Sequence, residues 1–116
     1  MYLTIDIEIT NRCNATCHFC PRDATPHQGI MDVETFDQAL ARAVEYRQVV
    51  KEVSGLAVTV SLCGLGEPLI NPNAVSFVEK VKREGFNCSM SSNGALLTEN
   101  KARALLDAGL DQIFIN

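Results

Sequence analysis

Three cysteines lie within eight residues of one another near the N-terminus, at C-x3-C-x2-C spacing: Cys13, Cys17 and Cys20. Thiolates bind zinc and iron–sulfur clusters, so three of them this close in one loop predict a metal site. A cluster with four irons requires four ligands. Three cysteines would hold three irons and leave the fourth open to a substrate or cofactor, as in an open catalytic zinc site. The ligand count therefore favours a catalytic centre over a structural one.

A second motif accompanies the cysteines, and the pair resembles the signature of the radical S-adenosylmethionine (radical SAM) superfamily. Phe19 stands directly before Cys20, as an aromatic residue does in the family's motif. Residues 64–68 read Gly-Leu-Gly-Glu-Pro and are similar to the family's GGEP segment, with Leu65 in place of the second glycine. The two motifs occur in the family's order. The resemblance covers essentially the whole chain.

The resemblance implies a particular chemistry. It implies a [4Fe–4S] cluster held by Cys13, Cys17 and Cys20, with S-adenosylmethionine bound at the open iron and cleaved reductively to a 5′-deoxyadenosyl radical. That radical would remove hydrogen from a peptide or small-molecule substrate, and flavodoxin or ferredoxin would supply the electron. The Cys-Pro-Arg and Gly-Glu-Pro-Leu sequences look most like the branch with SPASM or Twitch C-terminal extensions.

The resemblance also implies which residues contact the cofactor. Phe19 would lie near its adenine. Gly64 and Gly66 have no Cβ, so their carbonyls can approach closely and, with Glu67, bind the methionine ammonium group. Polar residues after the third and fourth predicted strands would contact its carboxylate or ribose: Ser92, Asn93 and Asn116. Ordinary packing, a tight turn or a helix cap is the alternative at these positions.

Two other classes of protein use clustered cysteines. A zinc-stabilised binding module could complete its site with His18, His27 or Cys63, since zinc accepts three cysteines and one histidine. A ferredoxin-like electron-transfer protein would need a fourth cysteine ligand close in sequence. Neither class explains residues 64–68. Cys63 and Cys88 stand next to strand residues, so we expect both to be small buried hydrophobes.

Composition and charge exclude several classes. The chain has 116 residues, 47% of them hydrophobic and 21% charged, which is typical of one globular domain at most. Its net charge is −4 and no stretch concentrates lysine and arginine, so it carries no electrostatic signature of nucleic-acid binding. It has no signal-peptide pattern and no apolar run near the ~18 residues of a membrane span. Five cysteines without an export signal predict a cytoplasmic protein with metal-bound rather than disulfide-bonded cysteines.

Four segments have the pattern of strands. Residues 3–10 alternate between aliphatic side chains and a second face that carries Asp6 and Glu8, which would be either a solvated face or part of the site. Residues 56–63 alternate in the same way. Residues 86–92 and 111–116 are the third and fourth predicted strands.

Helical spacing of apolar residues predicts a helix in each interval between strands. The first begins after the N-cap Asp32 and ends at residues 54–55. The second has Asn71 as N-cap and Pro72 as first helical residue, and it ends at Gly85. The third begins near Thr98 and ends at Gly109. The apolar residues expected to be buried are Val33, Phe36, Leu40, Ala43, Val44 and Val50 in the first helix, Val75, Val78 and Val81 in the second, and Ala102, Leu105 and Leu106 in the third.

The order β-α-β-α-β-α-β predicts an α/β fold of parallel strands with right-handed crossovers. Sites in such folds gather at the carboxyl ends of the strands, which is where all the residues of interest stand. The resemblance implies a partial TIM-type barrel of βα units, of which this chain would supply about half. An apolar fourth strand would leave an aggregation-prone edge. We therefore expect residues 1–116 to be the N-terminal portion of a radical SAM core domain in a longer chain.

Overall fold

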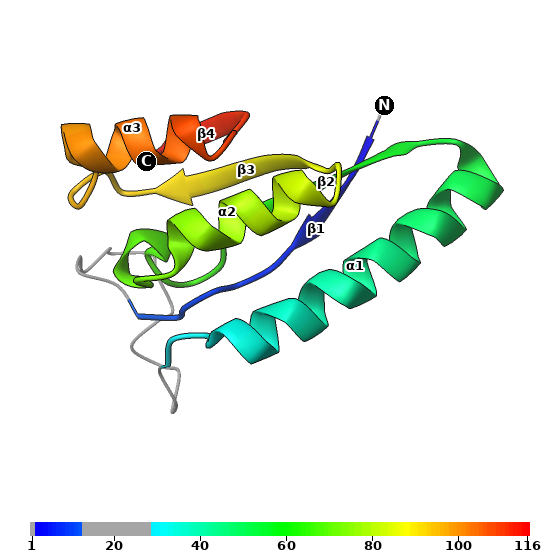
Figure 1. The fold of residues 1–116 in the computed structure, drawn as a ribbon, viewed down its shortest axis with the longest axis horizontal. Helices are drawn as coiled ribbons and strands as arrows, with labels where there is room; N and C mark the ends of the chain where they lie inside the picture. Colours follow the sequence, from blue (N-terminus) through cyan, green and yellow to red (C-terminus); the bar gives the residue numbers. More distant parts are fainter. Residues whose placement is uncertain (1, 13–28) are drawn as a thin grey trace.

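The computed structural model describes residues 2–12 and 29–116. Within these residues four parallel strands form one sheet in the order β1-β2-β3-β4 (Figure 1). The strands are β1 (Tyr2–Asp6), β2 (Ala57–Leu62), β3 (Asn87–Ser92) and β4 (Gln112–Ile115). The helices α1 (Val33–Ser54), α2 (Ala74–Arg83) and α3 (Glu99–Asp107) alternate with them. The predicted α/β fold with parallel strands is confirmed.

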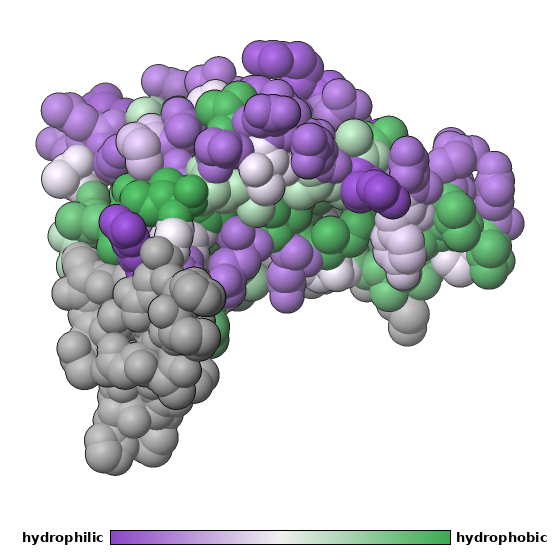
Figure 2. Space-filling model, turned by 90° about the horizontal axis from the view of Figure 1, so that it is seen from below, coloured by the Kyte–Doolittle hydropathy of each residue, from purple (hydrophilic) through white to green (hydrophobic). Residues whose placement is uncertain are grey.

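Neighbouring strands are also neighbours in sequence, so right-handed crossovers place the helices on the same face of the sheet. The core fills the space between that face and the helices. Its largest fully buried side chains include Phe36 of α1, Phe77 of α2 and Leu105 of α3. Exposed apolar residues remain on α1 and β4, and Figure 2 shows apolar patches among mostly hydrophilic residues on the face seen from below.

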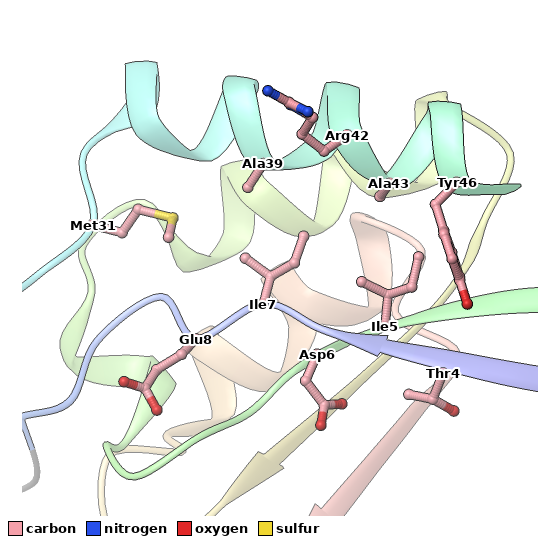
Figure 3. Close-up of a pocket in the computed structure, with 10 residues that line it drawn as sticks. All are labelled: Thr4, Ile5, Asp6, Ile7, Glu8, Met31, Ala39, Arg42, Ala43 and Tyr46. Atoms are coloured by element: carbon pink, nitrogen blue, oxygen red, sulfur yellow. The ribbon is translucent and has the colours of Figure 1, made fainter.

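The alternation predicted for residues 3–10 is present, although the regular strand ends at Asp6. Ile5 and Ile7 point toward α1, and Asp6 and Glu8 point the other way (Figure 3). The chain stays extended beyond the strand, because the N–H of Ile7 donates to the carbonyl of Ser61 at 2.9 Å. A pocket of about 640 Å³ lies between β1 and α1, and among the described residues none of the predicted cofactor contacts lines it.

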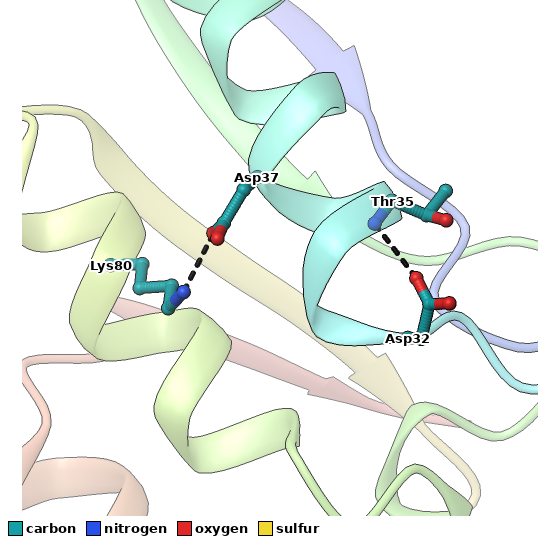
Figure 4. A network of polar contacts seen from close by, with 4 residues as sticks. All are labelled: Asp32, Thr35, Asp37 and Lys80. Carbon is teal, nitrogen blue, oxygen red and sulfur yellow. Dashed lines mark hydrogen bonds and ion pairs between the residues drawn. The ribbon is translucent and has the colours of Figure 1, made fainter.

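Local signals placed the ends of α1 correctly. The Asp32 carboxylate accepts a hydrogen bond of 2.7 Å from the N–H of Thr35, as an N-cap does (Figure 4). Hydrogen bonding from the Thr35 side chain first, and from its N–H second, lowers the pKa of Asp32, because both favour the charged form. Across the helix pair, Lys80 of α2 lies 2.6 Å from the carboxylate of Asp37. These contacts fix the beginning of α1 beside α2.

The predicted start of the second helix was wrong. Residues Pro68–Ile70 form a 3-10 turn, η2, and α2 begins only at Ala74 after the N-cap residue Asn73. Asn71 is 0% exposed instead of capping a helix at the surface. Its Oδ1 accepts a local hydrogen bond from the N–H of Asn73, but its Nδ2 is bonded to two distant parts of the backbone.

Two residues predicted to be buried are exposed. Val33 is 39% exposed at the first position of α1, and Leu106 of α3 is 70% exposed. The face of α3 that meets the core is centred on Leu105, so the next residue falls on the flank of the helix and is exposed. The apolar character of a residue does not show whether it lies at the buried centre of a helix face or at its exposed flank.

Candidate functional site

The loop after β2 lies directly against the chain that leads into the cysteines. The N–H of Glu67 donates a hydrogen bond of 2.7 Å to the carbonyl of Arg12, the residue before Cys13. A Cβ on Gly66 would collide with the backbone of Thr10 and Arg12. Only glycine allows two backbones to approach this closely. The second motif is therefore in contact with the residue next to the first predicted metal ligand.

Glu8 holds the same loop from the sheet. Its Oε2 accepts a hydrogen bond of 2.8 Å from the N–H of Leu65, and its carboxylate occupies the space that a Cβ on Gly64 would need. The sequence pattern allows Glu8 to lie either on a solvated face or in the site. The structure shows that it binds the loop and belongs to the edge where the predicted residues gather.

The carboxylate of Glu67 is buried, with the residue 2% exposed. Its Oε1 accepts hydrogen bonds from the hydroxyl of Ser92 at 2.8 Å and from the N–H of Leu69 at 3.2 Å. Its Oε2 accepts one from the N–H of Asn93 at 2.7 Å. Burying a carboxylate requires such partners. Glu67 therefore joins the loop after β2 to the end of β3.

Ser92 and Asn93 form a turn at the end of β3. The Ser92 hydroxyl accepts a hydrogen bond of 3.0 Å from the N–H of Gly94, and Asn93 Oδ1 accepts one of 2.9 Å from the N–H of Ala95. The N–H of Asn116 donates to the carbonyl of Ser92 at 3.0 Å, which places the end of β4 beside the same turn. The predicted residues after β2, β3 and β4 thus meet at one edge of the sheet. Their contacts with a cofactor stay predictions.

The residues that flank the cysteine segment pair with each other. We call residues 9–12 and 29–31 the base ribbon. Thr10 and Ile30 form an antiparallel bridge, and the N–H of Met31 donates to the carbonyl of Ile9 at 2.9 Å. The Thr10 hydroxyl and the N–H of Asn11 both donate to the carbonyl of Gly29, at 2.7 and 3.3 Å. The predicted ligands and the predicted adenine contact lie outside the described residues: Cys13, Cys17, Cys20 and Phe19.

The two other cysteines differ in their surroundings. Cys88 is fully buried, as predicted, and burial raises the pKa of its thiol to about 12. Cys63 is only half-buried, next to Ser61 and Asp6, and its pKa is raised chiefly by burial. Among residues 2–12 and 29–116, no group of three or more histidine, cysteine, aspartate or glutamate side chains could hold a metal ion.

Sequence reasoning missed the parts played by Glu8, Thr10 and Asn71. Each is a polar residue next to a motif, and each bonds backbone groups that are far away in sequence. Asn71 stands three residues after Pro68, in a position that looks like a helix cap. No local sequence pattern distinguished Asn71 from a helix N-cap.

A sequence model described as the Radical SAM superfamily matches residues 7–116. The chain belongs to this superfamily. The match covers the base ribbon, the loop of residues 64–67 and all three helices, so the radical SAM assignment rests on the described site as well as on the cysteine motif.

Individual radical SAM relatives cover nearly all of the chain. It is 31% identical over 111 residues to the tungsten-containing aldehyde ferredoxin oxidoreductase cofactor-modifying protein of Pyrococcus furiosus, covering 95% of the chain and 29% of that protein. It is 31% identical over 115 residues to a probable GTP 3′,8-cyclase of Methanothermobacter thermautotrophicus, covering 98% of the chain and 34% of the relative. The chain thus spans about a third of the length of these relatives.

A solved structure has a similar fold. The crystal structure of BtrN in complex with AdoMet and 2-DOIA superposes with a TM-score of 0.81 at 23% identity, over 99% of this chain and 45% of BtrN. The described radical SAM fold therefore corresponds to about half of that chain. No helix among the described residues is both long and apolar enough to cross a membrane.

Proposed function

We propose that the chain is the N-terminal portion of a radical SAM enzyme with a [4Fe–4S] cluster on Cys13, Cys17 and Cys20. When bound, the cluster and S-adenosylmethionine supply the reductive cleavage that produces a 5′-deoxyadenosyl radical, and this radical takes hydrogen from the substrate. The observation that carries the proposal is the contact between Glu67 and Arg12, at 2.7 Å. It brings the second family motif next to the first cysteine of the first motif.

The described residues fit such a cofactor. Gly66 allows the loop to lie against Arg12, where no residue with a Cβ could, so the backbone of the loop lies beside the residue that precedes Cys13. The donor set supports iron over zinc, since three thiolates in a radical SAM sequence leave one iron open. The zinc-stabilised and ferredoxin-like alternatives give no role to this loop.

Among the described contacts, one oxygen of Glu67 accepts only one hydrogen bond. A carboxylate oxygen has two lone pairs, and Oε2 accepts from the N–H of Asn93. We propose that Oε2 and the carbonyls of Gly64 and Gly66 bind the ammonium group of S-adenosylmethionine. Ser92, Asn93 and Asn116 would contact its carboxylate or ribose, and Phe19 its adenine.

The relatives do not fix the substrate. One is named as a probable GTP 3′,8-cyclase, one as a cofactor-modifying protein of a tungsten-containing aldehyde ferredoxin oxidoreductase, and BtrN was crystallised with 2-DOIA. We propose a peptide or small-molecule substrate, a flavodoxin or ferredoxin as electron donor, and a cytoplasmic location. The SPASM or Twitch branch stays a prediction that the sequence beyond this chain would test.

The test uses the full-length protein that contains this chain, purified and reconstituted without oxygen. Dithionite and S-adenosylmethionine should yield 5′-deoxyadenosine, measured by liquid chromatography, and iron and sulfide should be present in near-equal amounts. Cys17→Ala should abolish the product, whereas Cys88→Ala, a buried cysteine in β3, should not. Bound zinc without iron, or an unchanged yield from Cys17→Ala, would overturn the proposal.

A further inference from the structure

We propose that Asn71 is a positioning residue for the metal centre. Its side chain fixes the base ribbon, and the base ribbon carries both ends of the cysteine segment. This inference rests on the proposed function, because it concerns the cluster on Cys13, Cys17 and Cys20.

Asn71 binds both strands of the base ribbon. Its Nδ2 donates one hydrogen bond to the carbonyl of Ile9, at 2.8 Å, and another to the carbonyl of Met31, at 3.0 Å. One amide group therefore spans the two chain segments that lead into and out of residues 13–28. Ile9 is buried as well, so water cannot replace the bond to its carbonyl.

The same residue is tied to the loop that would hold S-adenosylmethionine. Asn71 directly follows the 3-10 turn η2, and its own N–H donates to the carbonyl of Pro68 at 3.0 Å. Its Oδ1 accepts a hydrogen bond of 2.8 Å from the N–H of Asn73 at the start of α2. The side chain of Asn71 thus connects the base ribbon to the start of α2, and its backbone N–H connects it to the loop that follows β2.

The hydrogen bonds at position 71 require the side-chain amide of asparagine. Both ribbon partners are carbonyls, so the residue must donate twice, and its Oδ1 must accept from an N–H. Aspartate has nearly the same shape but places a carboxylate oxygen against the two carbonyls. Serine has only one hydroxyl group to donate, and its side chain is shorter than that of asparagine. Both substitutions weaken or remove the bonds to the carbonyls of Ile9 and Met31 while removing little apolar volume, and the Ile9 carbonyl keeps the N–H of Met31 as a partner.

A purely structural residue would affect stability alone. Groups that orient metal ligands without binding the metal usually change metal affinity by roughly 10–100-fold when they are replaced. Asn71 is in the position to act in this way because its bonds converge on the ends of the ligand segment. The effect on iron retention should therefore exceed what the loss of stability alone produces.

The experiment compares Asn71→Asp and Asn71→Ser with Leu105→Ala in the full-length holoprotein. Leu105 is buried in α3 and is not part of the base ribbon, so its truncation is expected to lower stability without removing a hydrogen bond of the base ribbon. Iron release to a chelator is timed under anaerobic conditions, and urea midpoints are measured on the same samples. Both Asn71 variants should release iron at least about tenfold faster than wild type. Leu105→Ala should release iron at a rate within about twofold of wild type, although its urea midpoint is similar to those of the Asn71 variants.

A second readout needs no iron. Hydrogen exchange at the amide of Met31, which donates to the carbonyl of Ile9, should accelerate in the iron-free Asn71 variants and not in Leu105→Ala. If Asn71→Asp does not fold, Asn71→Ser decides the outcome. Iron release no faster than in Leu105→Ala would overturn the inference while leaving the proposed function intact. A wild-type protein that binds no iron would instead overturn the proposed function, and this inference with it.

Discussion

The hydroxyl of Ser92 donates a hydrogen bond of 2.8 Å to Oε1 of Glu67, and this bond joins the ends of β2 and β3. Both residues are 2% exposed, so water does not compete for the bond. A family motif predicted to contact the cofactor is thus also a structural connection between two loops. Changes at Glu67 should affect stability and cofactor binding together.

Glu67→Gln should destabilise the protein. The glutamine amide offers one acceptor oxygen where the carboxylate offers two, so an N–H of Leu69 or Asn93 would meet an amide N–H instead of an oxygen. We expect the free energy of unfolding in urea to fall by about 1–3 kcal/mol. The control Glu99→Gln breaks an exposed pair with Arg103 and should change it by less than about 1 kcal/mol. Equal effects of the two substitutions would show that the buried carboxylate is not a structural connection.

Gly66→Ala should separate the loop from the base ribbon. The new Cβ would meet backbone atoms of Thr10 and Arg12, which cannot move aside as a flexible side chain does. Urea denaturation should show a loss of about 1–3 kcal/mol, the usual range for overpacking. Gly29→Ala is the matched control, because a Cβ there meets nothing within 4 Å. A Gly66 variant as stable as the Gly29 variant would contradict the close approach.

Cys88 should make the protein less stable at alkaline pH. Burial first, and the nearby Asp111 second, raise its pKa from 9.0 to about 12. The folded state therefore keeps the thiol proton that the unfolded state loses above pH 9, and stability falls as pH rises from about 9 toward 12. Wild type should lose up to about 1.4 kcal/mol per pH unit more than Cys88→Ala in this window, measured by urea unfolding. Parallel pH profiles for the two proteins would contradict this assignment.

Asp111 should contribute the opposite dependence in acid. Although burial tends to raise its pKa, hydrogen bonds from Lys82 and from the N–H of Cys88, at 2.7 and 2.8 Å, lower it overall. The stability it provides is therefore present above pH 4 and is lost as pH falls through the lowered pKa. Asp111→Asn should be less stable than wild type at pH 7, with the difference shrinking toward pH 3. A difference that is constant with pH would show that the charge of Asp111 does not contribute.

The sequence by itself determined the family and the order of the elements. Period-2 and helical patterns, together with the caps Asp32 and Thr98, predicted β1 to β4 and α1 to α3 but not the 3-10 turn η2, and both caps accept the expected hydrogen bonds, from Thr35 and Lys101. These signals succeed because a cap or an amphipathic face depends on residues within one or two turns. The two motifs identified the superfamily for a related reason, since each is a short contiguous segment.

Only the tertiary structure decided how these segments meet. Asn71 precedes a proline and looks locally like a helix cap, yet its amide binds carbonyls 62 and 40 residues away. Glu67 is likewise bonded to Ser92, 25 residues further along the chain. The partners of a buried polar group are set by which backbone atoms the fold brings within about 3 Å, and no sequence pattern records that distance. The sequence therefore supplied the chemistry of the site, and the packing of loops at one sheet edge supplied its geometry.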